Sequence, residues 1–382
     1  MKVGIVTHYY KSINYGGNLQ AYALCKELIK LGHIPEQLCV PIDYYENKYK
    51  LHYTKIKVCI YRLLQCIKHI KYHQKYKSRK KEVKKFNEKY IPHSKKIYTI
   101  KNITEMEDGY DVIITGSDIV WNPKVHSPFF FLSFVSNSTP KFSYAASTGI
   151  DDFNINDKNV FYKELSSFQD ISVREKSIAL LLSNLMDRKV NLCADPTLLL
   201  TKEEWDEVCV DRFIQHKYVY TYFLGSNTNA VNCAQLYAKK YGYKVVNIPF
   251  LSSTYNKNND FGDIKLSDVS PQMFISLIKH AECVFTDSFH ACVFSYIYNK
   301  KVFSFRRNET DNIGVRIRDF LNLIGIEDHY CDSNEKENLE YLESLEKTEC
   351  IYENEKIQEL VNTSIKYLND NLKKAEERIK NK

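Results

Sequence analysis

The sequence lacks the features that would assign it at once to a membrane, secreted or metal-binding class. No window approaches the roughly 18 uncharged apolar residues that a membrane-spanning helix needs. The opening MKVGIVTHYY is too short and too strand-like for a signal peptide. The eleven cysteines are scattered singly from Cys25 to Cys350 without a CxxC pair, which favours free thiols over disulfides or zinc. We therefore expect a cytoplasmic protein with no bound metal or other cofactor.

Acidic residues are absent from one long stretch of the chain. Between Asn47 and Lys81 there are twelve Lys or Arg residues and no Asp or Glu, and apolar residues recur there at helical spacing: Ile56, Ile60, Leu63, Leu64, Ile67 and Ile70. This pattern predicts a basic amphipathic helix over about 55–85. The helix could lie on an anionic membrane surface, or it could pack on the protein with its lysines in solvent. No nucleic-acid-binding module accompanies the charge, so no nucleic-acid partner is predicted.

Short apolar segments alternate with helical patterns along the chain. The predicted strands are KVGIVT, IPEQLCV, DVIITG, KFSYAAS, ISV and VNLCA in the first half, and YVYTYFL, YKVVNIP, ECVFTDS and KVFSF in the second. Helices are expected at about 18–31, 228–241, 271–280, 289–297 and 313–324. This alternation predicts an α/β fold of two Rossmann-like domains, with parallel sheets and crossover helices, that face each other across a cleft.

The alternating series breaks near Asp195-Pro196-Thr197, which we interpret as an interdomain turn. The expected N-terminal domain is therefore 1–195, with a basic helical insertion at about 48–90, and the C-terminal domain is 196–345. A last helix within 346–382 could pack back on the N-terminal domain through one apolar stripe: Ile357, Leu360, Val361, Ile365, Leu368 and Leu372. Ligands of such folds bind at the carboxyl ends of the strands, so polar segments at predicted strand ends are the candidate sites.

The first such segment is SINYGGNLQAYAL. Gly16 and Gly17 permit close backbone approach, and the following helix turns its free amides toward the loop. Together with Asn14 and Asn18 they could bind an anion or a sugar hydroxyl, although the segment is neither a GxGxxG nor a P-loop. The alternative is a tight turn that is capped by Asn14 or Asn18.

The second segment is ITGSDIVWNP. Asp118 could take a proton from a hydroxyl group, and Trp121 could offer a platform for a sugar ring. Alternatively, Ser117 or Asp118 only caps a helix.

Two further segments carry single charged candidates. In SVREKS, Arg174 directly follows a strand and suits a phosphate or a carboxylate, unless it pairs with Glu175 or another acid. In FTDSFHACVFS, His290 is either a working residue at a strand end or a core histidine.

The order of these segments is similar to that of the polysaccharide pyruvyl transferase family: NYGGNLQAYAL, GSDIVWNP, YAAS, SVRE, DPTLLL, TDSFHACVFS and VRIRDFL. The resemblance runs from about residue 1 to 325. It implies a fold like the GT-B glycosyltransferases. It also implies transfer of pyruvate from phosphoenolpyruvate onto two hydroxyls of a cell-surface, capsular or exopolysaccharide precursor, which gives a ketal and phosphate. The acceptor would be a sugar or a lipid-linked oligosaccharide, which a protein peripheral to the inner face of the membrane could reach.

The resemblance also implies roles for individual residues. Arg174 and Arg316 would bind the donor together with Ser288 and His290. His290 would contact the phosphate or act as an acid, and Asp118 would act as a base or position the acceptor.

The sequence departs from the better-known family pattern at two motifs. Ser288 and Phe289 precede His290 where Arg-Leu-His is the better-known form, and Ile119 replaces a glutamine in the second motif. Three other arginines could restore the missing charge: Arg306, Arg307 and Arg318. Two alternatives therefore stay open, a glycosyltransferase that uses a nucleotide sugar and a non-catalytic glycan-binding relative.

Overall fold

The N-terminal half of the chain forms a parallel sheet. The computed structural model describes residues 1–41, 74–123, 127–150, 154–251, 261–307, 314–346, 352 and 354–381. The sheet has the strand order β3-β2-β1-β4-β5 with every pair parallel, and its strands are β1 (Lys2–Val6), β2 (Ile34–Cys39), β3 (His93–Ile97), β4 (Val112–Thr115) and β5 (Lys141–Ser143). Two short strands, β6 (Ser172–Val173) and β7 (Asn191–Leu192), continue it beyond β5 through isolated bridges.

The C-terminal half repeats this plan. Its sheet has the order β10-β9-β8-β11-β12-β13, again all parallel, with strands β8 (Tyr218–Tyr222), β9 (Lys244–Asn247), β10 (Ile264–Lys265), β11 (Cys283–Thr286), β12 (Val302–Phe305) and β13 (Tyr330–Cys331). In both sheets the first strand is central and the strand order reverses beside it, which is the Rossmann arrangement. The predicted fold class is therefore confirmed.

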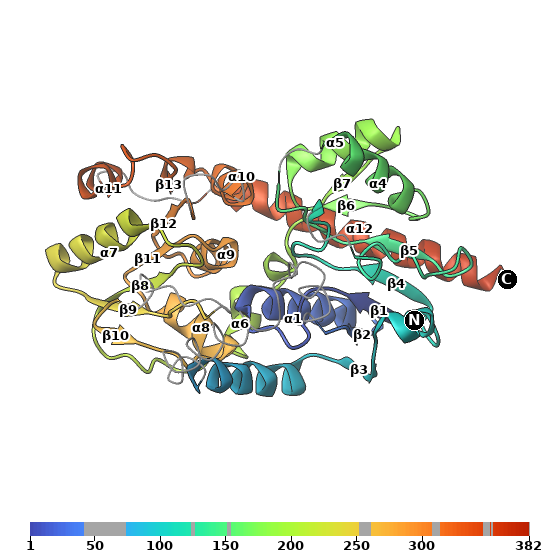
Figure 1. Cartoon of the computed structure of the whole chain (residues 1–382), viewed down its shortest axis with the longest axis horizontal. Coiled ribbons are helices and arrows are strands. Elements are labelled where there is room, and N and C mark those ends of the chain that lie inside the picture. Colours follow the sequence, from blue (N-terminus) through green and yellow to red (C-terminus); the bar gives the residue numbers. More distant parts are fainter. Residues whose placement is uncertain are drawn as a thin grey trace, which may run out of the picture.

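Helices cover the two sheets and fill the space between them (Figure 1). They are α1 (Tyr15–Lys30), α4 (Ile155–Leu165), α5 (Lys176–Met186), α6 (Lys202–Asp206), α7 (Thr228–Tyr241), α8 (Pro271–Lys279), α9 (Phe289–Ile297), α10 (Val315–Leu323), α11 (Leu339–Glu346) and α12 (Asn354–Lys380), with 3₁₀ turns η2 (Ile100–Met106), η4 (Pro196–Leu198) and η7 (Glu327–His329). The first helix begins earlier than predicted because the Asn14 side chain caps it at Tyr15.

The last helix, α12, runs along the N-terminal domain (Figure 1). Its Tyr367 hydroxyl donates to the Ser143 carbonyl of β5 at 2.9 Å, and its Ser364 Oγ accepts the Ala194 amide at 2.8 Å. The chain therefore crosses to the C-terminal sheet after Asp195 and returns to the first domain at its end.

The predicted basic helix is described only in part, because residues 55–73 lie outside the described residues. Residues 74–90 are helical, and the buried Arg79 donates from Nη1 to the Pro249 carbonyl at 2.9 Å and from Nε to the Ser267 carbonyl at 3.0 Å. Val83 and Phe86 on the same helix are also buried. This part of the helix thus packs its inner face on the protein, while its outer face exposes lysines: Lys77, Lys81, Lys84, Lys85 and Lys89.

The two domains meet through the first turn of α1. The Tyr15 hydroxyl donates to the Val269 carbonyl at 3.0 Å, and its ring stacks on Phe274 of α8 with the ring centroids 4.8 Å apart. Because α1 follows β1 and α8 follows β10, this contact brings the carboxyl ends of both sheets together. In the described part of the chain, no helix is long and apolar enough to cross a membrane.

Candidate functional site

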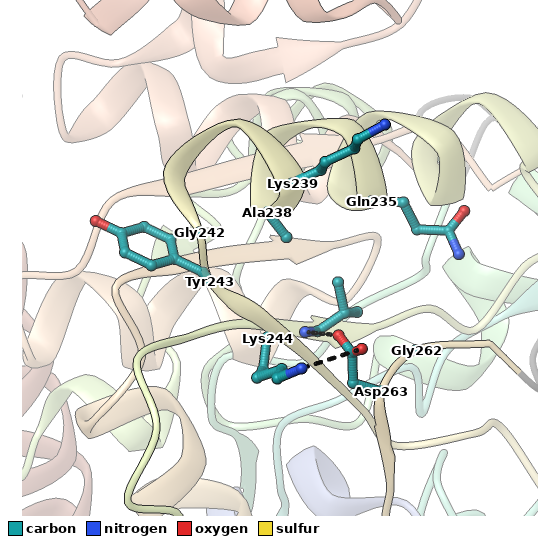
Figure 2. A pocket seen from close by; sticks show the side chains of 9 residues that line it. Gln235, Ala238, Lys239, Gly242, Tyr243, Lys244, Gly262 and Asp263 are labelled. Carbon is teal, nitrogen blue, oxygen red and sulfur yellow. Dashed lines mark hydrogen bonds and ion pairs between the residues drawn. The ribbon is translucent and has the colours of Figure 1, made fainter.

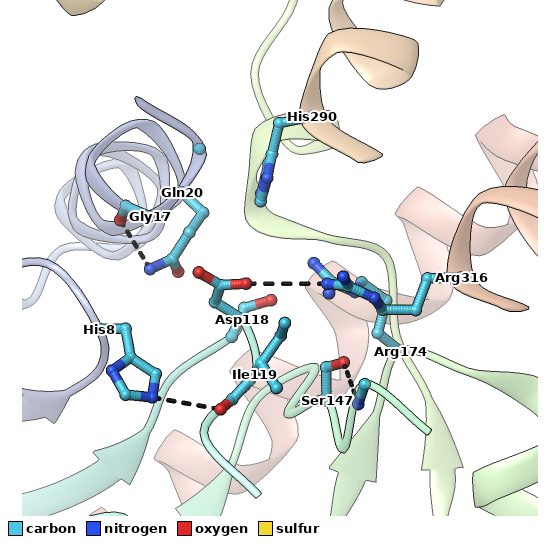
Figure 3. Close-up of polar contacts among 12 residues, drawn as sticks. His8, Gly17, Gln20, Asp118, Ile119, Ser147, Arg174, His290 and Arg316 are labelled. Atoms are coloured by element: carbon cyan, nitrogen blue, oxygen red, sulfur yellow. Dashed lines mark hydrogen bonds and ion pairs between the residues drawn. The ribbon is translucent and has the colours of Figure 1, made fainter. Parts of the chain in front are cut away.

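Charged side chains gather where the two domains meet (Figure 3). Asp118 follows β4, Arg174 follows β6, His290 lies in the first turn of α9, and Arg316 lies on α10. Their side chains are at most 7% exposed, a degree of burial that charged groups accept only when they have partners. The structure thus brings these four predicted site residues into one cluster.

Backbone geometry aims Asp118 into this cluster. Its φ of 73° lies in the left-handed region, which Asp tolerates better than most residues, and its carbonyl accepts the Ser147 amide at 2.9 Å. Its carboxylate faces Arg316 with Oδ1 and Nη1 4.0 Å apart. The alternative that Ser117 caps a helix does not hold, because its Oγ donates to Asp195 Oδ2 at 3.2 Å.

Asp195 links the two domains within the cluster. Its Oδ2 accepts Arg174 Nη1 at 2.5 Å and lies 3.5 Å from His290 Nε2, an ion-pair distance without hydrogen-bond geometry. Its Oδ1 accepts the Thr197 hydroxyl at 2.6 Å and the Thr197 amide at 3.0 Å. Asp195 therefore does fix a turn, as interpreted from the sequence, but it also holds two residues of the candidate site.

Several buried side-chain nitrogens in the cluster make no hydrogen bond to any described residue. They are Arg174 Nε and Nη2, Arg316 Nε and His290 Nε2. Leaving one buried donor unpaired costs about 1–3 kcal/mol, and more when the group is charged. Such a concentration of buried nitrogens that make no hydrogen bond could supply hydrogen bonds to an anion.

The charges in the cluster shift one another's pKa values. Burial alone would raise the pKa of Asp118, but the charges of His290, Arg174 and Arg316 lower it below its usual value. Burial, together with repulsion from Arg174 and Arg307, lowers the pKa of Arg316 to about 10. Asp118 is therefore ionised at neutral pH, and Arg316 carries a positive charge that its surroundings only partly balance.

Burial raises the pKa of Glu175, whereas it lowers the pKa of Arg316. The Glu175 Oε1 accepts the Ser147 hydroxyl at 2.5 Å, and its Oε2 has no hydrogen-bond partner within the described part of the chain. Arg174 does pair with acids, as the alternative held: its Nη1 donates to Asp195 Oδ2 at 2.5 Å, and its Nε lies 3.7 Å from Glu175 Oε1. This pairing does not occupy the whole guanidinium, because Nε and Nη2 make no hydrogen bond within the described residues.

Ser288 directly precedes α9 and is buried, and in the described structure its side chain makes no capping hydrogen bond. Of the three arginines proposed to compensate for it, Arg306 pairs with Glu337 at 3.1 Å and Arg318 pairs with Asp332 at 3.0 Å. Arg307 instead lies beside β11, where its charge lowers the pKa of Arg316. Arg307 is thus the one of the three arginines whose charge acts on the cluster.

The predicted anion site at the start of α1 is already filled by the protein. Asn14 Oδ1 accepts the amides of Gly16 and Gly17 at 3.1 and 3.5 Å, which is the capping alternative. Asn18 is fully buried, and its Oδ1 accepts Asn87 Nδ2 at 2.7 Å. Gly16 has a different role, because a Cβ there would lie 2.0 Å from His290 Nδ1.

The structure also removes Trp121 from the candidate site. Its indole is fully buried, donates from Nε1 to the Phe130 carbonyl at 3.1 Å and stacks on Phe131 with centroids 6.0 Å apart. The expectation of a platform for a sugar ring was wrong, because the turn after Asp118 directs this side chain into the core.

Two residues near the cluster were not predicted from the sequence. His8 follows β1, lies near Asp118 and engages the Ile119 carbonyl through Nε2 at 3.2 Å, and burial lowers its pKa. The sequence signal that could have identified His8 was its position directly after a predicted strand. Phe289 places its ring 4.2 Å from the Arg174 guanidinium carbon, a contact that no local pattern predicts.

A separate recess of about 560 Å³ lies on the C-terminal domain, between α7 and β9 (Figure 2). Two of its charged groups pair with each other, since Asp263 lies 3.8 Å from Lys244 Nζ, and Asp263 also accepts the Val245 amide at 2.8 Å. None of the predicted site residues lines it. Within the described residues, no group of three or more His, Cys, Asp or Glu side chains is placed to hold a metal ion.

Known structures resemble the whole chain. The UDP-GlcNAc 2-epimerase from Neisseria meningitidis, bound to UDP-GlcNAc, has a TM-score of 0.51 at 13% identity, and the match covers 98% of this chain and 100% of that one. The UDP-GlcNAc 2-epimerase from Methanocaldococcus jannaschii has a TM-score of 0.53 at 12% identity, with 93% and 95% covered. At such identities the likeness shows the fold alone, and it confirms the GT-B-type arrangement.

Sequence comparison identifies the family. No curated protein matches the chain. Residues 14–309, which include Asp118, Arg174 and His290, match the family model of the polysaccharide pyruvyl transferases. The chain therefore belongs to the polysaccharide pyruvyl transferase family.

Proposed function

We propose that this protein transfers pyruvate from phosphoenolpyruvate onto two hydroxyls of a sugar in a cell-surface, capsular or exopolysaccharide precursor, forming a ketal and releasing phosphate. Membership of a transferase family supports the reaction class. The observation that carries the choice of donor is the set of unpaired buried donors on Arg174, Arg316 and His290. A ligand with both a phosphate and a carboxylate would supply acceptors to all three.

The donor would bind between the two domains. Arg174 and Arg316 each offer guanidinium N–H groups that suit the paired oxygens of a carboxylate or phosphate. The first turn of α9 adds the positive end of a helix dipole, and Ser288 leaves the amides of that turn uncapped by its side chain. Arg307 would contribute further positive charge from the end of β12.

The proton balance of the reaction suits the residues present. One sugar hydroxyl adds to the central carbon of phosphoenolpyruvate while the methylene carbon gains a proton and becomes a methyl group. The second hydroxyl then displaces the phosphate, which leaves with the second proton. Asp118, ionised and facing the cluster, would accept a hydroxyl proton, and His290 would deliver a proton or hold the phosphate.

The test is incubation with phosphoenolpyruvate and a panel of hexose acceptors, following phosphate release and the mass of the sugar product. We expect release that depends on the acceptor, and a product one pyruvate ketal heavier. Asp118→Asn should abolish release while phosphoenolpyruvate still raises the melting temperature. A nucleotide sugar that raises the melting temperature when phosphoenolpyruvate does not would favour a glycosyltransferase instead. Glycan binding without phosphate release from any acceptor would favour a non-catalytic relative.

We further propose that the protein works on the cytoplasmic side of a membrane that carries its lipid-linked acceptor. The exposed lysines of residues 74–90 form the surface that would meet anionic lipid. Sedimentation with anionic and with neutral vesicles tests this proposal. We expect binding only to anionic vesicles, with loss of binding in high salt.

A further inference from the structure

Arg174 is held from two directions in the protein without ligand. Its Nη1 donates to Asp195 Oδ2 at 2.5 Å, in the plane of the guanidinium. The central carbon of the same guanidinium lies over the Phe289 ring, 4.2 Å from the ring centroid. The two contacts come from different parts of the chain, since Asp195 ends the N-terminal domain and Phe289 begins α9.

These two contacts leave the other donors of Arg174 available. A ring that stacks on the guanidinium face consumes none of the N–H groups, which all lie in the plane. Asp195 takes one of them. Nε lies 3.7 Å from Glu175 Oε1, and neither Nε nor Nη2 makes a hydrogen bond within the described ranges. The arrangement thus restrains the guanidinium and leaves these two nitrogens free to donate hydrogen bonds to a ligand.

The partners of Arg174 are themselves fixed. The Thr197 amide and hydroxyl hold Asp195 Oδ1, so the carboxylate cannot rotate freely. Phe289 is buried and packs edge-on against Phe320 of α10, with ring centroids 5.7 Å apart. A long flexible side chain such as Arg174 otherwise loses much rotamer freedom when it binds a ligand, so fixing it beforehand favours binding.

We propose that Phe289 and Asp195 are positioning residues that hold the Arg174 guanidinium ready for the anionic donor. The neighbouring Ser288 carries no charge. Donor binding should therefore depend more strongly on the orientation of Arg174 than it would if a second arginine stood at position 288. The inference rests on the proposed function only in taking phosphoenolpyruvate as the donor.

The first measurement needs no ligand. In protein with ¹⁵N-labelled arginine, the Arg174 Nε–H signal is assigned from its absence in Arg174→Lys. We expect this signal to be displaced upfield by the Phe289 ring, and to lose that displacement in Phe289→Leu. Phe294→Leu removes the same volume from the other side of α9, where Phe294 packs on Trp205, and it should leave the signal in place. An Arg174 signal that is the same in the parent and in Phe289→Leu overturns the proposal.

The second measurement is the affinity for phosphoenolpyruvate and for inorganic phosphate by calorimetry. Phe289→Leu should weaken phosphoenolpyruvate binding about tenfold, as expected for a desolvated cation–π contact, while Phe294→Leu lowers only the melting temperature. Replacing Phe289 by 4-fluoro-, 3,5-difluoro- and 3,4,5-trifluorophenylalanine should weaken binding stepwise, because each fluorine reduces the negative potential of the ring face. A merely structural role would not follow that series.

The third measurement concerns Asp195. Asp195→Asn keeps the shape but removes the charge, and it should weaken phosphoenolpyruvate binding at least as much as Phe289→Leu does. The control is Asp170→Asn, which loses contacts to Asn191 and Lys374 away from the cluster and should bind normally. Unchanged binding in both Asp195→Asn and Phe289→Leu overturns the inference. If instead the parent binds neither ligand while the Arg174 signal shows the ring displacement, the proposed function fails and the positioning of Arg174 stands.

Discussion

The two helices that meet at the domain boundary begin in opposite ways. At the start of α1, Asn14 caps the chain and takes the amides of Gly16 and Gly17. At the start of α9, Ser288 makes no such bond in the described structure, and nearby side-chain nitrogens of Arg174 and His290 make no hydrogen bond. The same strand-to-helix plan therefore gives one helix start that is capped by the preceding side chain and one that is not. The glycine in the first turn of α1 also affects the start of α9, because Gly16 leaves space for the His290 ring.

The largest effect on ligand binding should come from removing a positive charge from the cluster. Arg316→Gln should weaken phosphoenolpyruvate binding about a hundredfold or more, since a buried charged partner of an anion is lost. Calorimetry measures this directly. Arg318→Gln, on the same helix but paired with Asp332 at the surface, is the matched control and should bind normally. Equal effects from the two would mean that the anion lies elsewhere.

A smaller effect is expected from filling the space between the two helices. In Gly16→Ala the new Cβ would meet the His290 ring, so either the ring or α1 must move, at a cost of about 2 kcal/mol. Denaturant unfolding measures the loss, and phosphate release should fall with it. Adding His290→Ala should restore most of the stability but none of the activity. If the double variant is no more stable than Gly16→Ala alone, the new Cβ does not meet the His290 ring.

The caps themselves should differ in a direct comparison. Asn14→Ala removes acceptors from two amides and should lower the free energy of unfolding by about 1 kcal/mol. Ser288→Ala removes no capping bond and should change stability by less than about 0.5 kcal/mol. Thermal unfolding of the two variants side by side is the measurement. Equal losses would show that Ser288 caps α9 in solution.

The smallest effect is expected on the unfolding free energy at acidic pH. The cations around Asp118 lower its folded pKa, so its ionised form contributes stability at pH values above about 3.9, the value in the unfolded chain. That contribution is lost as the pH falls through the lowered folded pKa. The difference in unfolding free energy between the parent and Asp118→Asn should therefore shrink below about pH 4. A difference that stays constant with pH would contradict the charge interactions described.

The fold followed from the alternation of apolar strands and helices, because parallel strands buried on both faces leave a strong local pattern. The rule that polar residues at strand ends gather near each other placed Asp118, Arg174 and His290 in one cluster. The same rule failed for Trp121, because it gives the position of a residue but not the direction of its side chain. The contacts of Asp195 with Arg174 and His290 join segments that are distant along the chain, and only the packed structure shows them.

Arg79 has a consequence for how the two domains can move. Its helix lies against the N-terminal domain through Phe86 and α1, while its guanidinium holds two carbonyls of the C-terminal domain. Any hinge opening that separates the sheets on this side must break both of those hydrogen bonds and expose a buried charge. The helix thus makes wide opening costly on its side of the molecule.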